Sequence, residues 1–253
     1  MESNENIYDK IKELLGSLPS KLNVLEEKID IELQMEYFEQ SRRERNKLTH
    51  NSCLDSSSRL FSDEVSNTEK KCILAGIASL PEIEAYRTIE RFLTGNPGEL
   101  RNWGILALQE CRMLLESLLL DENHVFISTG LGGKGHKLRY FIVLFGKEKK
   151  DFKEFQRKII QNEFEICLKK YHSEMEELKF SGSIASMLVM IPMKVNIKNL
   201  FTEAIKDCNQ FGDFLISNFI ITNVKELSFD EIRTYVDHNQ EYNSDTQSKS
   251  DKK

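Results

Sequence analysis

The feature of this sequence that most restricts its fold is a change in the spacing of apolar residues near residue 123. Before that point, apolar residues recur every three or four positions, which is the period of a helix packed on one side. After it, short continuous apolar runs appear, such as residues 125–129 and 187–191, and such runs are typical of buried strands. The sequence therefore predicts a mixed fold, with an N-terminal α-helical segment followed by a domain that contains a β-sheet.

Residues 1–49 are predicted to form N-terminal helices. A short first helix lies between residues 7 and 18, and a second helix ends in a basic cluster near residue 47. The apolar stripe of the second helix has steps of three to five residues and consists of Leu22, Leu25, Ile29, Leu33 and Phe38. The serine-rich stretch 50–66 has no apolar periodicity and is predicted to be a polar linker.

Residues 67–122 have the strongest helix signals in the chain. Ser66 and Glu69 have the spacing of a capping box, Pro81 suits the first turn of a second helix, and Gly95 ends it. A third helix follows, with Trp103 at core spacing, and the short connections make neighbouring helices fold back on one another. The second helix is predicted to have a solvated charged face, made of Glu82, Glu84, Arg87, Glu90 and Arg91.

Three pieces of this region, 81–85 (PEIEA), 92–97 (FLTGNP) and 100–108 (LRNWGILAL), resemble a HEAT-type helical repeat. The resemblance covers residues 70 to about 120 and amounts to about one and a half repeats, whereas isolated solenoids need about three. It implies a protein-binding surface, or in some cases a nucleic-acid-binding one. The flanking helices or the next domain must then cover the ends of the repeat, and a plain helical bundle is the alternative.

Residues 123–236 are predicted to form an α/β domain with the order ββαβαβα and a mixed or partly parallel sheet. The two first strands flank a glycine-rich turn, and a long helix capped by Asp151 and Glu154 is predicted to continue to Leu178. Ser228 and Glu231 have the spacing of a second capping box, before a last short helix. Residues 237–253 are polar and are predicted to be disordered.

Composition excludes several classes of protein. No run of about 18 apolar residues is present, and the polar N-terminus is neither a secretory signal nor a basic transit peptide. The five cysteines are widely spaced, which favours reduced core thiols in a cytoplasmic protein over a disulfide frame or a zinc site. The net charge of −6 argues against nucleic-acid binding by the whole surface but allows a local basic patch. We expect no cofactor and no metal.

The glycine-rich turn is the strongest candidate site. Four of the 12 glycines fall within residues 130–135, where backbone N–H groups can converge on an anion. A strand follows the turn instead of a helix, so its context excludes a dinucleotide fingerprint and a P-loop, and the absence of later kinase motifs excludes a kinase loop. The predicted site is a hairpin that binds a partner, a phosphate or a nucleic acid, made of Gly130, Gly132, Gly133, Lys134, Gly135, His136, Lys137 and Arg139. A mobile turn with solvated charges is the alternative.

A second candidate site is the segment 45–50 (RNKLTH), in which Arg45 and His50 have the R-x4-H spacing of HEPN ribonucleases. That resemblance implies RNA cleavage, with His50 as acid or base and Arg45 stabilising the charge on the phosphorus centre. The same residue types also occur at helix C-termini because they complement the helix dipole.

Three functions follow as expectations. The first is a non-enzymatic adaptor that binds another protein through the HEAT-like helices and the glycine-rich hairpin. The second is a nucleotide- or nucleic-acid-binding protein that uses residues 130–139. The third is a HEPN-like ribonuclease that uses Arg45 and His50.

Overall fold

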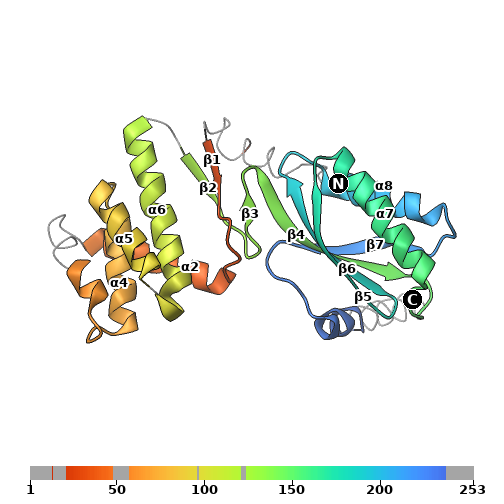
Figure 1. Cartoon of the computed structure of the whole chain (residues 1–253), viewed down its shortest axis with the longest axis horizontal. Helices are drawn as coiled ribbons and strands as arrows, with labels where there is room; N and C mark the ends of the chain where they lie inside the picture. Colours follow the sequence, from red (N-terminus) through yellow and green to blue (C-terminus); the bar gives the residue numbers. More distant parts are fainter. Residues whose placement is uncertain (1–12, 14–20, 48–56, 96, 121–123, 238–253) are drawn as a thin grey trace, which may run out of the picture. The chain divides into compact units, whose positions relative to one another are not determined.

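The protein divides into two compact units in a computed structural model that describes residue 13 and residues 21–47, 57–95, 97–120 and 124–237 (Figure 1). Of the described residues, those up to 138 form the helical unit and those from 139 onward form the sheet unit. The sequence predicted the boundary near residue 123. The structure has it between Leu138 and Arg139, because the first strand after residue 123 and the glycine-rich turn pack with the helices.

The helical unit is built mainly from helices, some of which begin at a polar side chain that caps them. Its elements are β1 (Lys21–Val24), α2 (Ile31–Lys47), η1 (Ser57–Phe61), α4 (Asn67–Ala78), α5 (Ile83–Thr94), η2 (Gly98–Leu100), α6 (Arg101–Leu120), β2 (His124–Ile127) and β3 (Gly133–Lys134). The Ser66 hydroxyl accepts a hydrogen bond from the Glu69 N–H, which confirms half of the predicted capping box. The Glu69 carboxylate forms an ion pair with Arg59 (2.5 Å). Gly95 ends α5 as predicted.

The core of the helical unit lies where α2, α4, α5 and α6 pack together. Trp103 is buried in it, donates its indole N–H to the Lys71 carbonyl (3.0 Å) and contacts the ring of Tyr37 edge to face. Part of the predicted linker also belongs to this core, because η1 places Leu60 there. The helices expected within 67–122 are therefore present, and their assignment to a HEAT repeat stays a prediction.

The helix predicted from Leu22 to Phe38 is wrong in its first half. Residues 21–24 are strand β1, which pairs in parallel with β2, with Leu22 opposite Val125. The helix α2 begins at Ile31, where the Asp30 carboxylate accepts the Glu32 N–H (2.8 Å). Apolar residues spaced three to five positions apart fit one long helix, and they fit equally well a strand and a turn followed by a helix. Pairing with the distant β2 decides in favour of the strand. The first predicted helix, 7–18, lies almost entirely outside the described residues.

The sheet unit alternates strands and helices. Its elements are β4 (Lys137–Gly146, which begins two residues before the unit boundary), α7 (Glu154–Lys170), β5 (Glu174–Ser181), β6 (Ile184–Pro192), α8 (Ile197–Asn209), β7 (Leu215–Thr222) and a helix that begins at residue 229. The strand order β7-β4-β6-β5, with helices after β4 and β6, is the split βαβ arrangement also called ferredoxin-like. β4 pairs with β7, and β5 with β6, in antiparallel fashion. β4 and β6, the strands that the predicted crossover joins through a helix, are neighbours in the sheet, and their parallel pairing stays a prediction.

One missed strand explains the different element order. The helix predicted to reach Leu178 ends at Lys170, and residues 174–181 form β5, so the predicted order ββαβαβα is wrong. The N-cap of α7 is Lys153, whose N–H donates to the Gln156 side chain (2.9 Å), and not the predicted Asp151. The predicted capping box at Ser228 and Glu231 is confirmed, since each side chain accepts the N–H of the other residue.

The core of the sheet unit is apolar. Every residue of β6 is buried, and α7 and α8 contribute Phe164 and Phe201, whose rings lie 5.8 Å apart. Phe201 also contacts Phe219 of β7, so α8 covers this side of the sheet. The residues of the predicted disordered tail from 238 onward lie outside the described part of the chain. None of the described helices is long and apolar enough to cross a membrane.

Candidate functional site

The glycine-rich turn is held tightly inside the helical unit. Gly130, Gly132 and Gly133 are buried, and the Gly133 N–H donates to the Leu25 carbonyl (2.8 Å). Gly132 has φ +68°, and a Cβ there would lie 2.5 Å from the carbonyl oxygen of Glu26. Glycine is needed at Gly132 because only it combines this left-handed backbone with so close an approach of another chain segment. A Cβ at Gly133 would overlap the Lys137 carbonyl oxygen, so Gly132 and Gly133 both have a packing role that accounts for them.

The exposed part of the hairpin is its tip. Lys134, Gly135 and His136 are exposed, and Lys134 lies opposite Lys137 in the short β3–β4 ladder. Arg139 belongs to the sheet unit, where its guanidinium binds the Glu176 carboxylate through two nitrogens (2.5 and 3.0 Å). The structure therefore brings Lys134, His136 and Lys137 together at the tip, and it engages Arg139 in an ion pair with β5.

Arg45 takes part in a buried polar cluster between α2 and α6. The Glu110 carboxylate, which is buried, accepts hydrogen bonds from the Tyr37 hydroxyl (2.5 Å), the Ser41 hydroxyl (2.7 Å) and the Arg45 guanidinium. Burial, and next to it the Glu110 charge, raises the pKa of Tyr37 well above its usual value. His50 lies outside the described residues, so the pairing of Arg45 and His50 stays a prediction. The described role of Arg45 is to neutralise a buried carboxylate.

The cysteines of the described residues are reduced, and three of them are buried: Cys111, Cys167 and Cys208. Burial raises the pKa of Cys111 and of Cys208 to about 12, and that of Cys167 to about 11, so these thiols are poor nucleophiles at neutral pH. Within the described residues, no group of three His, Cys, Asp or Glu side chains is arranged to hold a metal ion.

A pocket of about 510 Å³ lies on α5, beside η1. It is lined by Ser57, Ile83, Glu84, Arg87, Thr88 and Arg91. Arg87 and Arg91 are one helical turn apart and exposed, and among the described residues neither guanidinium forms an ion pair. The Arg91 guanidinium lies over the Phe61 ring, 4.4 Å from its centroid, which fixes one side of the pocket. The arrangement offers two cations and two hydroxyl groups to a ligand, against one carboxylate.

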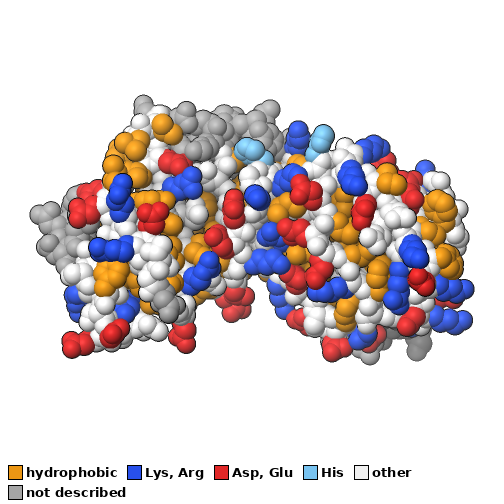
Figure 2. Space-filling view, viewed as in Figure 1, with side chains coloured by type: hydrophobic (Ala, Val, Ile, Leu, Met, Phe, Trp, Pro, Cys, Tyr) orange, Lys and Arg blue, Asp and Glu red, His pale blue; other side chains and the backbone are white. Residues whose placement is uncertain are grey.

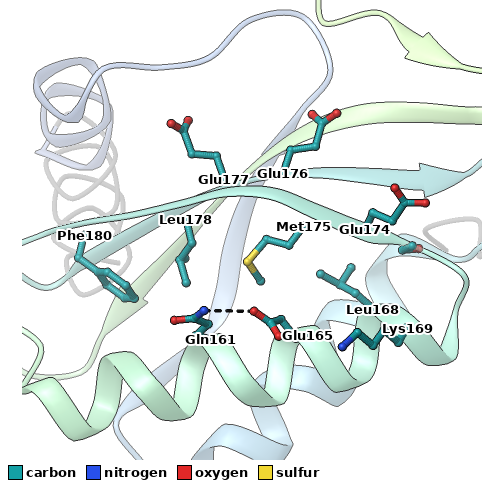
Figure 3. Close-up of a pocket in the computed structure, with 11 residues that line it drawn as sticks. Gln161, Glu165, Leu168, Lys169, Glu174, Met175, Glu176, Glu177, Leu178 and Phe180 are labelled. Atoms are coloured by element: carbon teal, nitrogen blue, oxygen red, sulfur yellow. Dashed lines mark hydrogen bonds between the residues drawn. The ribbon is translucent and has the colours of Figure 1, made fainter.

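A second hollow, of about 540 Å³, lies between α7 and the edge strand β5 (Figure 3). Met175, Leu178 and Phe180 point from β5 toward α7, whereas Glu176 and Glu177 point away from it. On the helix side, the Gln161 amide donates to the Glu165 carboxylate (3.2 Å) above the buried Leu168. The hollow therefore has an apolar floor of partly exposed side chains and a charged rim.

The last turn of α6 exposes three consecutive leucines, Leu118, Leu119 and Leu120, and Figure 2 shows hydrophobic side chains gathered over this end of the helix. Exposed apolar clusters of this kind mark interaction surfaces in soluble proteins. The cluster adjoins residues 121–123, which lie outside the described part, so we assign it no ligand.

Sequence reasoning missed both hollows. The pocket on α5 requires η1, which lies in a segment predicted to be a linker, although Arg87 and Arg91 were already recognisable as exposed cations. The hollow on β5 requires a strand at a segment predicted to be helical. The alternation of Leu178 and Phe180 with the charged or polar Glu177, Lys179 and Ser181 was the available signal.

Comparison with known proteins adds no relative to this picture. No protein-family model matches the chain, and no curated protein is similar enough to it to count as a match.

Proposed function

We propose that this chain is a non-enzymatic adaptor whose helical unit binds an acidic segment of another protein. The observation that carries the proposal is the pocket between α5 and η1, where Arg87 and Arg91 share one face without an ion-pair partner among the described residues. Two like charges one turn apart destabilise a helix by roughly 0.2–0.5 kcal/mol, and a bound carboxylate would remove that repulsion.

The composition of the pocket selects the ligand. Guanidinium groups bind carboxylates through paired hydrogen bonds, and the Ser57 and Thr88 hydroxyls can donate to further oxygens. Ile83, which is exposed beside them, provides an apolar contact. Glu84 would repel an acidic residue placed next to it, so we expect the acidic group of the ligand to lie toward the Arg91 end. These features favour a peptide that combines acidic and apolar side chains.

The HEAT-type resemblance supports the same surface. In that family, consecutive antiparallel helices present one face to a protein partner, and α4, α5 and α6 are consecutive helices that pack against one another. Fold resemblance alone does not fix a function, so the pocket and not the resemblance carries the proposal.

The experiment compares the wild-type chain with two double charge reversals. Arg87→Glu with Arg91→Glu should abolish retention of the partner that the wild type retains from cell extract. Lys149→Glu with Lys150→Glu is the matched control, because it makes the same charge change at exposed positions of the sheet unit. A Glu-rich peptide should compete with the partner more than ten-fold better than a Lys-rich peptide.

Retention of nucleic acid instead of protein, abolished by Lys134→Ala with Lys137→Ala, would favour the nucleic-acid function of residues 130–139 and overturn this proposal. Equal loss of the partner in the control variant would show a non-specific charge effect and overturn it as well.

A further inference from the structure

We propose that a second copy of this chain pairs with the free edge of β5 in antiparallel fashion, about a two-fold axis at Leu178, so that the sheets of two molecules form one continuous sheet. This dimer does not depend on the acidic-segment pocket proposed above. It rests on the edge position of β5, its apolar face toward α7 and the charge pattern along its outer face.

The first observation is the position of β5 in the sheet. Among the described strands it pairs only with β6, which leaves one side of its backbone without a strand partner. A β-bulge separates Met175 from Glu177, and the ladder from Glu177 to Ser181 is regular. An exposed regular edge is a template for another strand, and the regular part sets where a second strand can pair.

The second observation is the apolar face of β5. Leu178 and Phe180 are only partly covered by α7, and they border the hollow of about 540 Å³ (Figure 3). A strand added beside β5 would place its own alternating side chains over this hollow. In the proposed register Leu178 lies opposite the Leu178 of the other copy, so apolar side chains meet on the α7 side.

The third observation selects a copy of the same strand as the partner. Glu177 points away from α7 (Figure 3), and Lys179, two residues further along the regular ladder, lies on the same face. The two side chains form an ion pair along the strand (2.7 Å). With the axis at Leu178, each Glu177 lies opposite a Lys179 of the other copy. The four side chains then form a square in which every charge has two neighbours of opposite sign.

Other registers lack this complementarity. An axis at Lys179 places two lysines opposite each other, and an axis at Glu177 places two glutamates opposite each other, both of which are destabilising. Glu176 does not disturb the chosen register, because its carboxylate binds Arg139 across β6, toward the interior of the sheet. The charges of β5 therefore favour one antiparallel register.

The opposite edge of the sheet lacks such a pattern. β7 has the sequence LISNFIIT, without a charged residue, so no ion pair can select a register between two copies. Phe219 of β7 contacts Phe201 of α8, whereas Ile216 and Ile221 of this strand are exposed, so the β7 edge differs from β5 in its charges and not in a lack of apolar surface. The two edges thus differ, and the dimer is assigned to β5.

The test is sedimentation equilibrium of the full chain and of charge-reversal variants. We expect the wild type to be a dimer and Glu177→Lys alone, or Lys179→Glu alone, to weaken it about ten-fold or more, because two attractive pairs become repulsive. The double variant Glu177→Lys with Lys179→Glu restores every opposite pair between the two strands and should return the dissociation constant to within about three-fold of the wild type. Circular dichroism checks that each variant is folded.

A cross-link tests the register. Under mild oxidation, Leu178→Cys should form a covalent dimer, whereas Ile166→Cys, an exposed position of α7 outside the proposed strand pairing, should not do so above the wild-type level. Either of two results overturns the proposal: a wild type that is monomeric at its highest soluble concentration, or a dimer that neither single reversal weakens. Efficient cross-linking by Phe180→Cys but not by Leu178→Cys would overturn the proposed register.

Discussion

The helical unit and the sheet unit use polar groups in different places. In the helical unit, the Glu110 carboxylate is buried with Tyr37 and Ser41, and the buried Gln34 side chain donates to the carbonyls of Ile29 and Thr129. In the sheet unit, by contrast, the core is built from the apolar faces of β6, α7 and α8, and charged pairs such as Lys225 with Glu231 lie at the surface. The comparison indicates that buried polar contacts add to an apolar core in the first unit, whereas apolar packing dominates the core of the second.

The two units differ in their polar contacts because their strands are paired in different ways. In the helical unit, β1 lies near the beginning of the unit's sequence and its partner β2 near the end. The segments that follow these two strands, 25–30 and 128–133, therefore meet through backbone hydrogen bonds. In the sheet unit, by contrast, the inner strands are paired on both sides, and α7 and α8 supply apolar cover, so that among the described strands only the outer edges lack a strand partner.

The largest predicted effect tests the backbone contact in the helical unit. Gly132→Ala should lower the free energy of unfolding of this unit by about 2–4 kcal/mol, because its Cβ would overlap the carbonyls of Glu26 and Glu27 in a left-handed conformation. Gly135→Ala, also left-handed but in open space, should cost only about 1 kcal/mol. Denaturation followed by the fluorescence of Trp103, the only tryptophan, reports this unit. Equal costs at the two positions would contradict the packing role of Gly132.

The second prediction concerns the buried cluster. Glu110→Gln should destabilise the helical unit by about 2 kcal/mol, because it removes a charge-assisted acceptor from Tyr37, Ser41 and Arg45. The control Glu116→Gln makes the same change on α6, at a residue paired with Arg112 nearer the surface, and should cost less than about 0.5 kcal/mol. Urea titration with the Trp103 signal compares them. If Glu116→Gln costs as much as Glu110→Gln, burial does not set the strength of this cluster.

The smallest effect is expected in the sheet unit, at the cap of its last helix. Hydrogen bonds from Lys225 first, and then from Ser228, lower the pKa of Glu231 from 4.5 to about 2. The stabilisation by this carboxylate is therefore complete above about pH 4.5 and is lost as the pH falls toward 2. An NMR titration of the Glu231 carboxyl should find the low midpoint, and Lys225→Ala should raise it. A midpoint near 4.5 in the wild type would show that the cap is not formed in solution.

Local signals in the sequence predicted much of the fold. Capping residues such as Ser66 and Ser228, and the stop at Gly95, marked helix ends because their effects act within one turn. β1 and β5 were missed for a shared reason. Leu22 and Leu178 fit a helical spacing, and only pairing with strands elsewhere in the chain makes these segments extended.

The candidate site was less predictable than the fold. The cluster of glycines was correctly recognised as unusual. Its backbone contacts, however, involve Leu25 and Glu26, about a hundred residues earlier in the chain, and no local sequence pattern predicts such distant contacts. Arg87 and Arg91 were visible as an exposed pair, yet a pocket needs η1 beside them. Sequence thus indicated the residue types, and long-range packing determined which of them share a site.

The parallel pairing of β1 with β2 has a consequence for how the chain is made. On the ribosome β1 emerges first, and its partner strand follows only after α2, α4, α5 and α6 have been synthesised. Helices can form locally within microseconds, whereas a contact this distant in sequence must wait for the loop to close. The helical unit should therefore pass through a state in which its helices are assembled and its first strand is still unpaired, and that strand is the part most exposed to chaperones and proteases.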